Sequence, residues 1–284
     1  MTTTQFSLGA EEASEVIELL PKPSAALRLA EIWHYRELLY FLIWRDIRVK
    51  YKQTALGILW ALLQPVALMA IFSLFLGRYA QVPSGGTPYP IMVLAGLLPW
   101  QLFSQALSES SNSVVASERL ITKVYFPRVI IPAAAVGSAI PDFCIGFFVL
   151  IGLLPYYGIP ITVRLLIAPL FVALALLVAF AVGLWLSALN VQYRDVRHAI
   201  GFLIQAWMFV TPVVYPLSVV PHKWRHLYAL NPMVGVIEGF RRSVVEQQPF
   251  PGRIILVSVF ATVVVLAGGL FYFRRMEQTF ADII

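Results

Sequence analysis

A series of long apolar runs with almost no charge constrains this fold more than any other feature of the sequence. Hydrophobic residues make up 59% of the 284 residues and charged residues only 13%, about half the charged share of a soluble domain. A bilayer-spanning helix needs about 20 apolar residues, whereas a membrane β-barrel shows short alternating segments. A helix also pairs its own backbone N–H and C=O groups, which find no water in hydrocarbon. The runs therefore predict an all-α, polytopic membrane protein.

Six transmembrane helices follow from the positions of these runs. They are predicted at residues 57–76, 91–114, 129–154, 165–189, 200–214 and 254–273. Residues 1–25 contain several glutamates and lack the apolar core of a signal peptide, so they are predicted to be a flexible cytoplasmic leader. Residues 26–284 are predicted to form one transmembrane domain.

Lys and Arg residues are distributed unequally between the two sides of the predicted spans. The larger share lies in the N-terminal segment, the loops after the second and fourth spans, and the C-terminal tail. Because cytoplasmic loops retain basic residues, both termini are predicted to be cytoplasmic. Anionic lipid headgroups account for the formal net charge of +6, and no nucleic-acid partner is expected.

Residues 31–52 are amphipathic, with apolar side chains at helical spacing and charged side chains between them. This pattern predicts an N-terminal interfacial helix that lies along the membrane surface. Basic side chains near its end suit a lipid-phosphate entrance, because Arg and Lys bind phosphate oxygens. The alternative is an anchor without a further role. The candidate entrance residues are Arg45, Arg48, Lys50 and Lys52.

Residues 215–253 alternate prolines with apolar stretches that are too short to cross a membrane. Proline interrupts helices, and irregular backbone at membrane depth must be covered by protein. The region is therefore predicted to form short re-entrant helices before the last span, with an ordinary folded loop as the alternative.

Polar side chains recur every three or four residues in the second predicted span. Lipid cannot satisfy such a stripe, so it faces protein or water. One interpretation is hydrogen bonding between helices; the other is a channel for an uncharged sugar polymer, whose hydroxyls match amides and hydroxyls. The stripe consists of Gln101, Ser104, Gln105, Ser108, Ser111 and Asn112.

Aromatic residues gather toward the outer half of the predicted membrane region. They are interpreted either as an interfacial aromatic belt or as stacking surfaces for sugar rings along a glycan channel. The residues are Trp100, Phe103, Trp207, Phe209 and Tyr215.

Charged residues elsewhere suggest contacts rather than catalysis. Asp142 is interpreted as the only acid well inside an apolar run, a functional candidate by default. The loop after the second span carries mixed charges suited to receive force from a motor protein, or is a simple connector; these residues are Glu118, Arg119, Lys123 and Arg128.

The chain lacks a G-x-x-x-x-G-K-[ST] phosphate loop, so ATP hydrolysis is expected in a separate subunit. Neither a metal site nor a catalytic residue set is predicted.

Several motifs occur in an order that is specific in combination. They are RDIRVKYKQTALGILWALLQP (45–65), PYPIMVLAGLLPWQLFS (88–104), LITKVYFPRVIIP (120–132), LSALNVQYRDV (186–196), FVTPVVYP (209–216), LNPM (230–233) and EGFR (238–241). Over roughly residues 30–245 the chain resembles bacterial ABC-transporter permeases for O-antigen and related polysaccharides.

This resemblance implies a homodimer in the bacterial inner (plasma) membrane, associated with two copies of a separate ATP-binding subunit. It implies export of an undecaprenyl-diphosphate-linked polysaccharide, with ATP and Mg bound by the partner ATPase and no cofactor in this chain. Residues of the second and fifth spans would line the glycan path, and residues 120–128 would include the ATPase coupling surface. The alternatives are an ABC permease for another lipid or drug cargo, a stand-alone secondary transporter, and a non-transporting scaffold.

Overall fold

The computed structural model describes residues 34–52, 57–124, 126–193, 195–245, 249–277 and 279–280. These residues form helices, turns and loops, and no strand occurs among them. The predicted all-α polytopic class is therefore confirmed. The predicted leader, residues 1–25, lies outside the described residues.

Five helical segments are long and apolar enough to cross a membrane. The first is α3 (Gly57–Phe72), which continues as the π-helical η1 (Ser73–Tyr79). The second is α4 (Tyr89–Ala116), and the third joins α6 (Ile130–Gly137) to α7 (Ile140–Tyr156). The fourth joins η2 (Val163–Ile167) to α8 (Ala168–Gln192), and the last is α12 (Gly252–Glu277). They coincide with five of the six predicted spans.

The remaining predicted span, residues 200–214, is helical but short. It corresponds to α9 (Val196–Phe209), which has 14 residues and a length of about 21 Å at 1.5 Å per residue. The hydrocarbon core is about 30 Å thick. The run of apolar residues continues to Val214, but the backbone turns after Phe209, and Pro212 has no N–H with which to extend a helix. The prediction of a sixth full-length span at this position is thus corrected.

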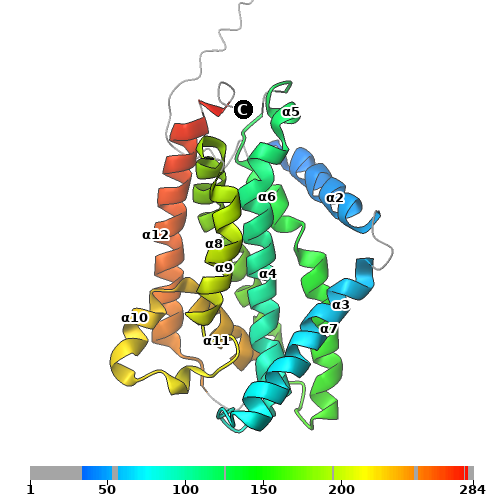
Figure 1. Cartoon of the computed structure of the whole chain (residues 1–284), viewed down its shortest axis with the longest axis vertical. Helices are drawn as coiled ribbons and strands as arrows, with labels where there is room; N and C mark the ends of the chain where they lie inside the picture. Colours follow the sequence, from blue (N-terminus) through cyan, green and yellow to red (C-terminus); the bar gives the residue numbers. More distant parts are fainter. Residues whose placement is uncertain are drawn as a thin grey trace, which may run out of the picture.

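Helix α4 is the centre of the bundle (Figure 1). It packs most extensively against α8, and also against α6, α11, α7 and α3. Its apolar side chains form the main core, in which Phe103 and Leu107 are fully buried. A buried helix in a membrane protein contacts other helices rather than lipid, which explains how α4 accommodates polar residues.

Small residues allow the close approach of α4 and α8. A methyl group added at Gly183 of α8 would collide with Ser110 Oγ and lie 2.8 Å from Ser110 Cβ. Overpacking of this kind costs about 1–3 kcal/mol. We therefore expect Gly183→Ala to lower the thermal midpoint of the detergent-solubilised protein, as measured by fluorescence-detected size exclusion.

The matched control for this substitution is Gly152→Ala in α7, where no atom lies within 4 Å of the added methyl group. It should leave the midpoint unchanged. Ser110→Ala in the Gly183→Ala background should recover part of the loss, because it removes the Oγ collision. Equal midpoints for Gly183→Ala and the wild type would contradict the packing argument.

Residues 217–244 form the short helices predicted before the last span: η3 (Leu217–Val219), η4 (His222–Trp224), α10 (Arg225–Ala229) and α11 (Pro232–Val244). The Asn231 side chain caps α11 by accepting a hydrogen bond from the backbone N–H of Met233 at 3.1 Å. Helix α11 is buried along nearly its whole length against α4, α8 and α12. It lies at the end of the bundle away from the C-terminus (Figure 1).

A buried ion pair ties α11 to the turn that follows α9. Arg241 Nη1 donates to Glu238 Oε1 at 2.9 Å, and Arg241 Nη2 donates to the carbonyls of Pro212 and Val213 at 3.0 and 2.9 Å. The Asn231 amide donates to Thr211 Oγ1 at 2.9 Å. The Arg241 bonds satisfy carbonyls of the turn beyond α9, and the Asn231 bond reaches a side chain of the same turn.

Helix α2 (Arg36–Lys52) lies at an angle to the bundle, near the C-terminal end of the molecule (Figure 1). It packs mainly against α6, where Ile43 contacts the position of Gly137. Leu42 is its one buried residue within the described range. This arrangement agrees with the predicted amphipathic helix outside the spans.

Candidate functional site

A groove of about 510 Å³ with both polar and apolar walls lies beside α4. Its walls come from the end of α2 and from α3, α4, α7 and α9. Four of its residues belong to the predicted polar stripe: Gln101, Ser104, Gln105 and Ser108. The other polar and aromatic residues in the walls are Lys50, Tyr51, Trp60, Gln64, Asp142 and Phe143.

The remaining two residues of the stripe, Ser111 and Asn112, form hydrogen bonds within α4 and with α8 instead of lining the groove. Ser111 Oγ donates to the carbonyl of Leu107 at 2.6 Å, and the Asn112 amide donates to the carbonyl of Ser108 at 2.8 Å. Asn190 of α8 donates to Asn112 Oδ1 at 3.2 Å. The stripe therefore has two parts: one lines the groove, and the other joins α4 to α8.

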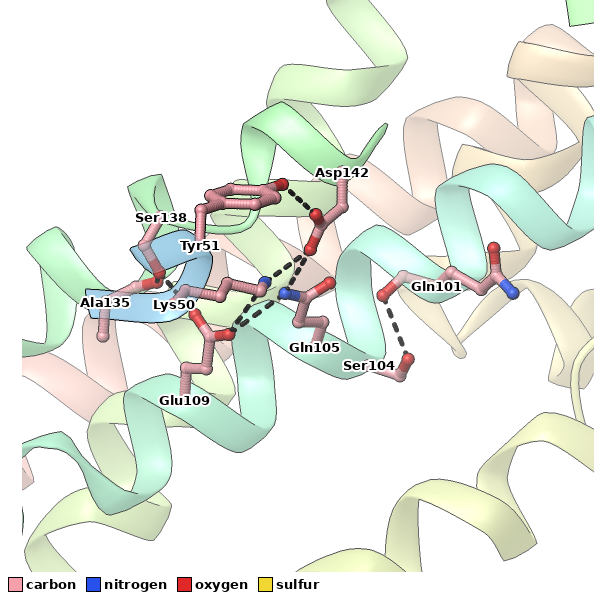
Figure 2. A network of polar contacts seen from close by, with 9 residues as sticks. All are labelled: Lys50, Tyr51, Gln101, Ser104, Gln105, Glu109, Ala135, Ser138 and Asp142. Carbon is pink, nitrogen blue, oxygen red and sulfur yellow. Dashed lines mark hydrogen bonds and ion pairs between the residues drawn. The ribbon is translucent and has the colours of Figure 1, made fainter. Parts of the chain in front are cut away.

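A charged network includes several of the residues that line the groove near the end of α2 (Figure 2). Lys50 Nζ forms an ion pair with Asp142 of α7 and lies 3.4 Å from Glu109 Oε1 of α4. The Gln105 amide donates to both acids, at 2.7 Å to Asp142 and 3.0 Å to Glu109. One ammonium and one amide thus bridge two carboxylates that belong to different helices.

Two hydroxyl groups complete the hydrogen bonding of these carboxylates. Tyr51 donates to Asp142 Oδ1 and Ser138 donates to Glu109 Oε2. Burial raises the pKa of the Tyr51 hydroxyl, and its hydrogen bond to Asp142 raises this pKa further, so Tyr51 remains a donor. Each acid then has three donors, which reduces the cost of holding negative charge away from bulk water.

Glu109 is the functional candidate that the sequence analysis missed. Asp142 was interpreted as the only acid within an apolar run, but Glu109 also lies in a span and faces it (Figure 2). A signal was present, because Gln101, Gln105 and Glu109 are spaced four residues apart and therefore share one helix face.

The four basic residues of the predicted lipid-phosphate entrance have different surroundings. Only Lys50 lines the groove. The Arg45 guanidinium lies 2.8 Å from the carboxylate of its neighbour Asp46, and the Arg48 guanidinium stacks 5.1 Å from the centre of the Trp44 ring. Lys52 is exposed. The structure does not bring these four cations to one point.

The five aromatic candidates lie outside the walls of the groove. Trp100 and Phe103 are buried in the core, and the Trp207 ring lies 5.1 Å from that of Phe103. Phe209 is exposed. The Tyr215 hydroxyl hydrogen-bonds the Tyr228 hydroxyl at 2.7 Å.

Three of the four coupling candidates are exposed beyond the end of α4: Glu118, Arg119 and Lys123. The fourth, Arg128, is partly buried against the end of α12, where Glu277 binds it. The described residues contain no group of three or more His, Cys, Asp or Glu side chains arranged to hold a metal ion.

Comparison with known proteins adds family information to this geometry. Residues 37–245 match the family model described as ABC-2 type transporter. The O-antigen export system permease protein RfbA of Myxococcus xanthus is 31% identical, over 89% of this chain and 98% of that protein. An RfbA of Klebsiella pneumoniae is 26% identical over 87% and 95%, and the polysialic acid transport protein KpsM of Escherichia coli is 24% identical over 82% and 91%.

Proposed function

The chain belongs to the ABC-2 type transporter family, and from this premise we propose that it is the membrane-spanning permease subunit of an ATP-driven exporter of lipid-linked polysaccharide. Relatives that are similar over nearly their whole length carry names of O-antigen export and polysialic acid transport. The cargo class proposed for this chain follows from those names and from the chemistry of the groove.

The observation that carries the proposal is the neutral polar wall of the groove. Gln64, Gln101, Ser104 and Ser108 contribute amides and hydroxyls to a groove whose walls also hold the charged Lys50 and Asp142 and several apolar side chains. Gln101 Nε2 is buried and has no hydrogen-bond acceptor among the described residues, a state that costs about 1–3 kcal/mol.

Further parts of the proposal concern lipid and partners. An undecaprenyl-diphosphate anchor would bring negative charge to the α2 side of the molecule, where the exposed Arg48 and Lys52 supply positive charge. We propose a homodimer with two copies of an ATP-binding subunit, which would hold ATP and Mg. Few of the residues from 59 to 79 are buried within one chain, which supports a neighbouring copy or lipid on that face.

Orientation completes the proposal. The bacterial inner membrane would hold the chain with both termini in the cytoplasm, on the side where α2, α5 (Glu118–Ile121) and the end of α12 gather (Figure 1). Basic residues on α2 and on the loop after α4 favour this side as cytoplasmic. ATP hydrolysis would then occur in the partner subunit, on the cytoplasmic side of α2 and α5.

Deletion of the gene tests the proposed function. We expect finished lipid-linked polymer to accumulate inside the cell and surface glycan to disappear, because synthesis continues without export. Localisation of the polymer by fractionation and immunoblotting measures this result, and complementation with the wild-type gene is the control. Unchanged surface glycan in the deletion strain would overturn the proposal.

A further inference from the structure

Residues near the C-terminal end of the described chain contact the loop between α4 and α6. The two segments are far apart in the sequence. Helix α5 lies in this loop, at the same end of the bundle as the end of α12 (Figure 1). Two described residues near the end of the chain, Glu277 and Phe280, contact the loop at Arg128. The last transmembrane helix thus leads directly into a contact with the cytoplasmic loop.

The polar part of this contact is reciprocal. The backbone N–H of Arg128 donates to Glu277 Oε1 at 3.0 Å, and the Arg128 guanidinium donates to the backbone carbonyl of Glu277. Each residue therefore contributes one main-chain group and one side chain. The guanidinium satisfies a carbonyl at the end of α12, where cations are favoured by the helix dipole.

The apolar part of the contact brings together α2, the loop after α4 and the segment after α12. Phe280 is fully buried and packs edge-to-face on Phe273, with ring centres 5.3 Å apart. The same buried cluster contains Leu42 of α2, and Ile121 and Phe126 of the loop. The Arg128 guanidinium lies 5.9 Å from the centre of the Phe280 ring, within the range of a cation–π contact.

The opposite side of the loop has no such cover. Glu118, Arg119 and Lys123 are exposed, and Val124 is 53% exposed. These side chains form the accessible part of the coupling candidates, whereas Arg128 faces the tail. One side of the loop is thus fixed to the last span and the other side is available to a partner.

We propose that Glu277 and Phe280 are positioning residues that hold the cytoplasmic loop, residues 117–129, in the orientation that the ATP-binding subunit requires. This inference rests on the proposed function of the chain. Fixing the loop before docking removes conformational freedom that the partner would otherwise have to pay for in binding. It also gives a short rigid connection between the partner and the last transmembrane helix.

The first test measures the loop without any cargo. Cys144 is the single cysteine, so Cys144→Ser provides a background in which Lys123→Cys carries one spin label. In the purified full-length chain, Glu277→Ala and Phe280→Ala should each increase label mobility. Glu277→Gln keeps the acceptor for the Arg128 N–H, and Phe280→Leu keeps an apolar side chain, so both should resemble the parent. Unchanged mobility in both alanine variants would overturn the positioning role.

The second test measures coupling in the complex with the ATP-binding subunit, using only variants that co-purify with it in normal amounts. Polymer export and ATP hydrolysis are followed together in membrane vesicles. We expect the alanine variants to export about fivefold less polymer per ATP hydrolysed, which corresponds to a loss of roughly 1 kcal/mol of free energy that holds the loop in place. Glu277→Gln and Phe280→Leu should keep the wild-type ratio. A wild-type ratio in the alanine variants would overturn the inference. Failure of the wild-type complex to export polymer would instead refute the proposed function and leave the mobility result standing.

Discussion

Replacement of Lys50 by alanine is expected to abolish export and to lower the yield of folded protein. The ammonium is the positive charge between Asp142 and Glu109, and Gln105 provides only a neutral donor to both. Without Lys50 the two carboxylates repel each other in a region of reduced dielectric constant. The expected cost is about 2 kcal/mol, less than for a fully buried pair, because the Lys50 side chain is 32% exposed.

Control variants separate the folding effect from the transport effect. Lys50→Arg keeps the charge and should fold normally. Lys50→Ala combined with Glu109→Gln and Asp142→Asn removes all three charges and should recover the folded yield, while export stays at least about tenfold low because the groove has lost its cation. Arg45→Ala removes a pair that is exposed and local, and should have little effect on yield.

Folded yield is measured by size exclusion in detergent, and export by immunoblotting of surface glycan. Wild-type yield and export in the single Lys50→Ala variant would show that the charged network is unnecessary. Recovery of full export in the triple variant would show that Lys50 serves only to neutralise the two acids.

Filling the groove without breaking hydrogen bonds between helices is expected to block export in a stable protein. Ser104 and Ser108 both line the groove, and the Ser104 hydroxyl bonds only within its own helix, to the carbonyl of Gln101 at 3.1 Å. Phenylalanine at either position adds a ring to the cavity and removes a hydroxyl from its wall. We expect surface glycan to fall by at least about tenfold, the scale of a change of 1.4 kcal/mol or more.

The matched control is Val264→Phe on α12, where the original side chain is 53% exposed and the added ring would face lipid or solvent. Subunit association and thermal stability of all three variants are measured by pull-down with the ATP-binding subunit and by size exclusion. Normal export by stable Ser104→Phe and Ser108→Phe variants would exclude the groove as the polysaccharide path.

The spans were predictable from sequence because the thickness of the hydrocarbon imposes a minimum length on any apolar run that crosses it. This argument failed at α9, where composition alone suggested a span to Val214. The helix ends earlier, before Pro212, and Arg241 holds the carbonyls of Pro212 and Val213 from 29 and 28 residues away. A bond between a side chain and a distant carbonyl leaves no periodic signal in the sequence.

The groove was predictable in part for the same reason. Four residues of the polar stripe were placed correctly on one helix face by their spacing of three and four residues. The contacts of Lys50 with two acids were not predictable, because these partners are 59 and 92 residues away in the sequence. The contact of Arg128 with Glu277 was likewise not predictable, because the two residues are 149 positions apart.

The fixed turn after α9 has a consequence for how this helix moves. Asn231 and Arg241 hold the chain just beyond Phe209, whereas most residues from 196 to 203 are exposed. A helix that is held at one end can rotate about that end more easily than it can move along its own axis. Any displacement of α9 is therefore expected to increase from Phe209 toward Val196. Because α9 borders the groove at Gly201 and Ile204, the groove would widen most on the α2 side.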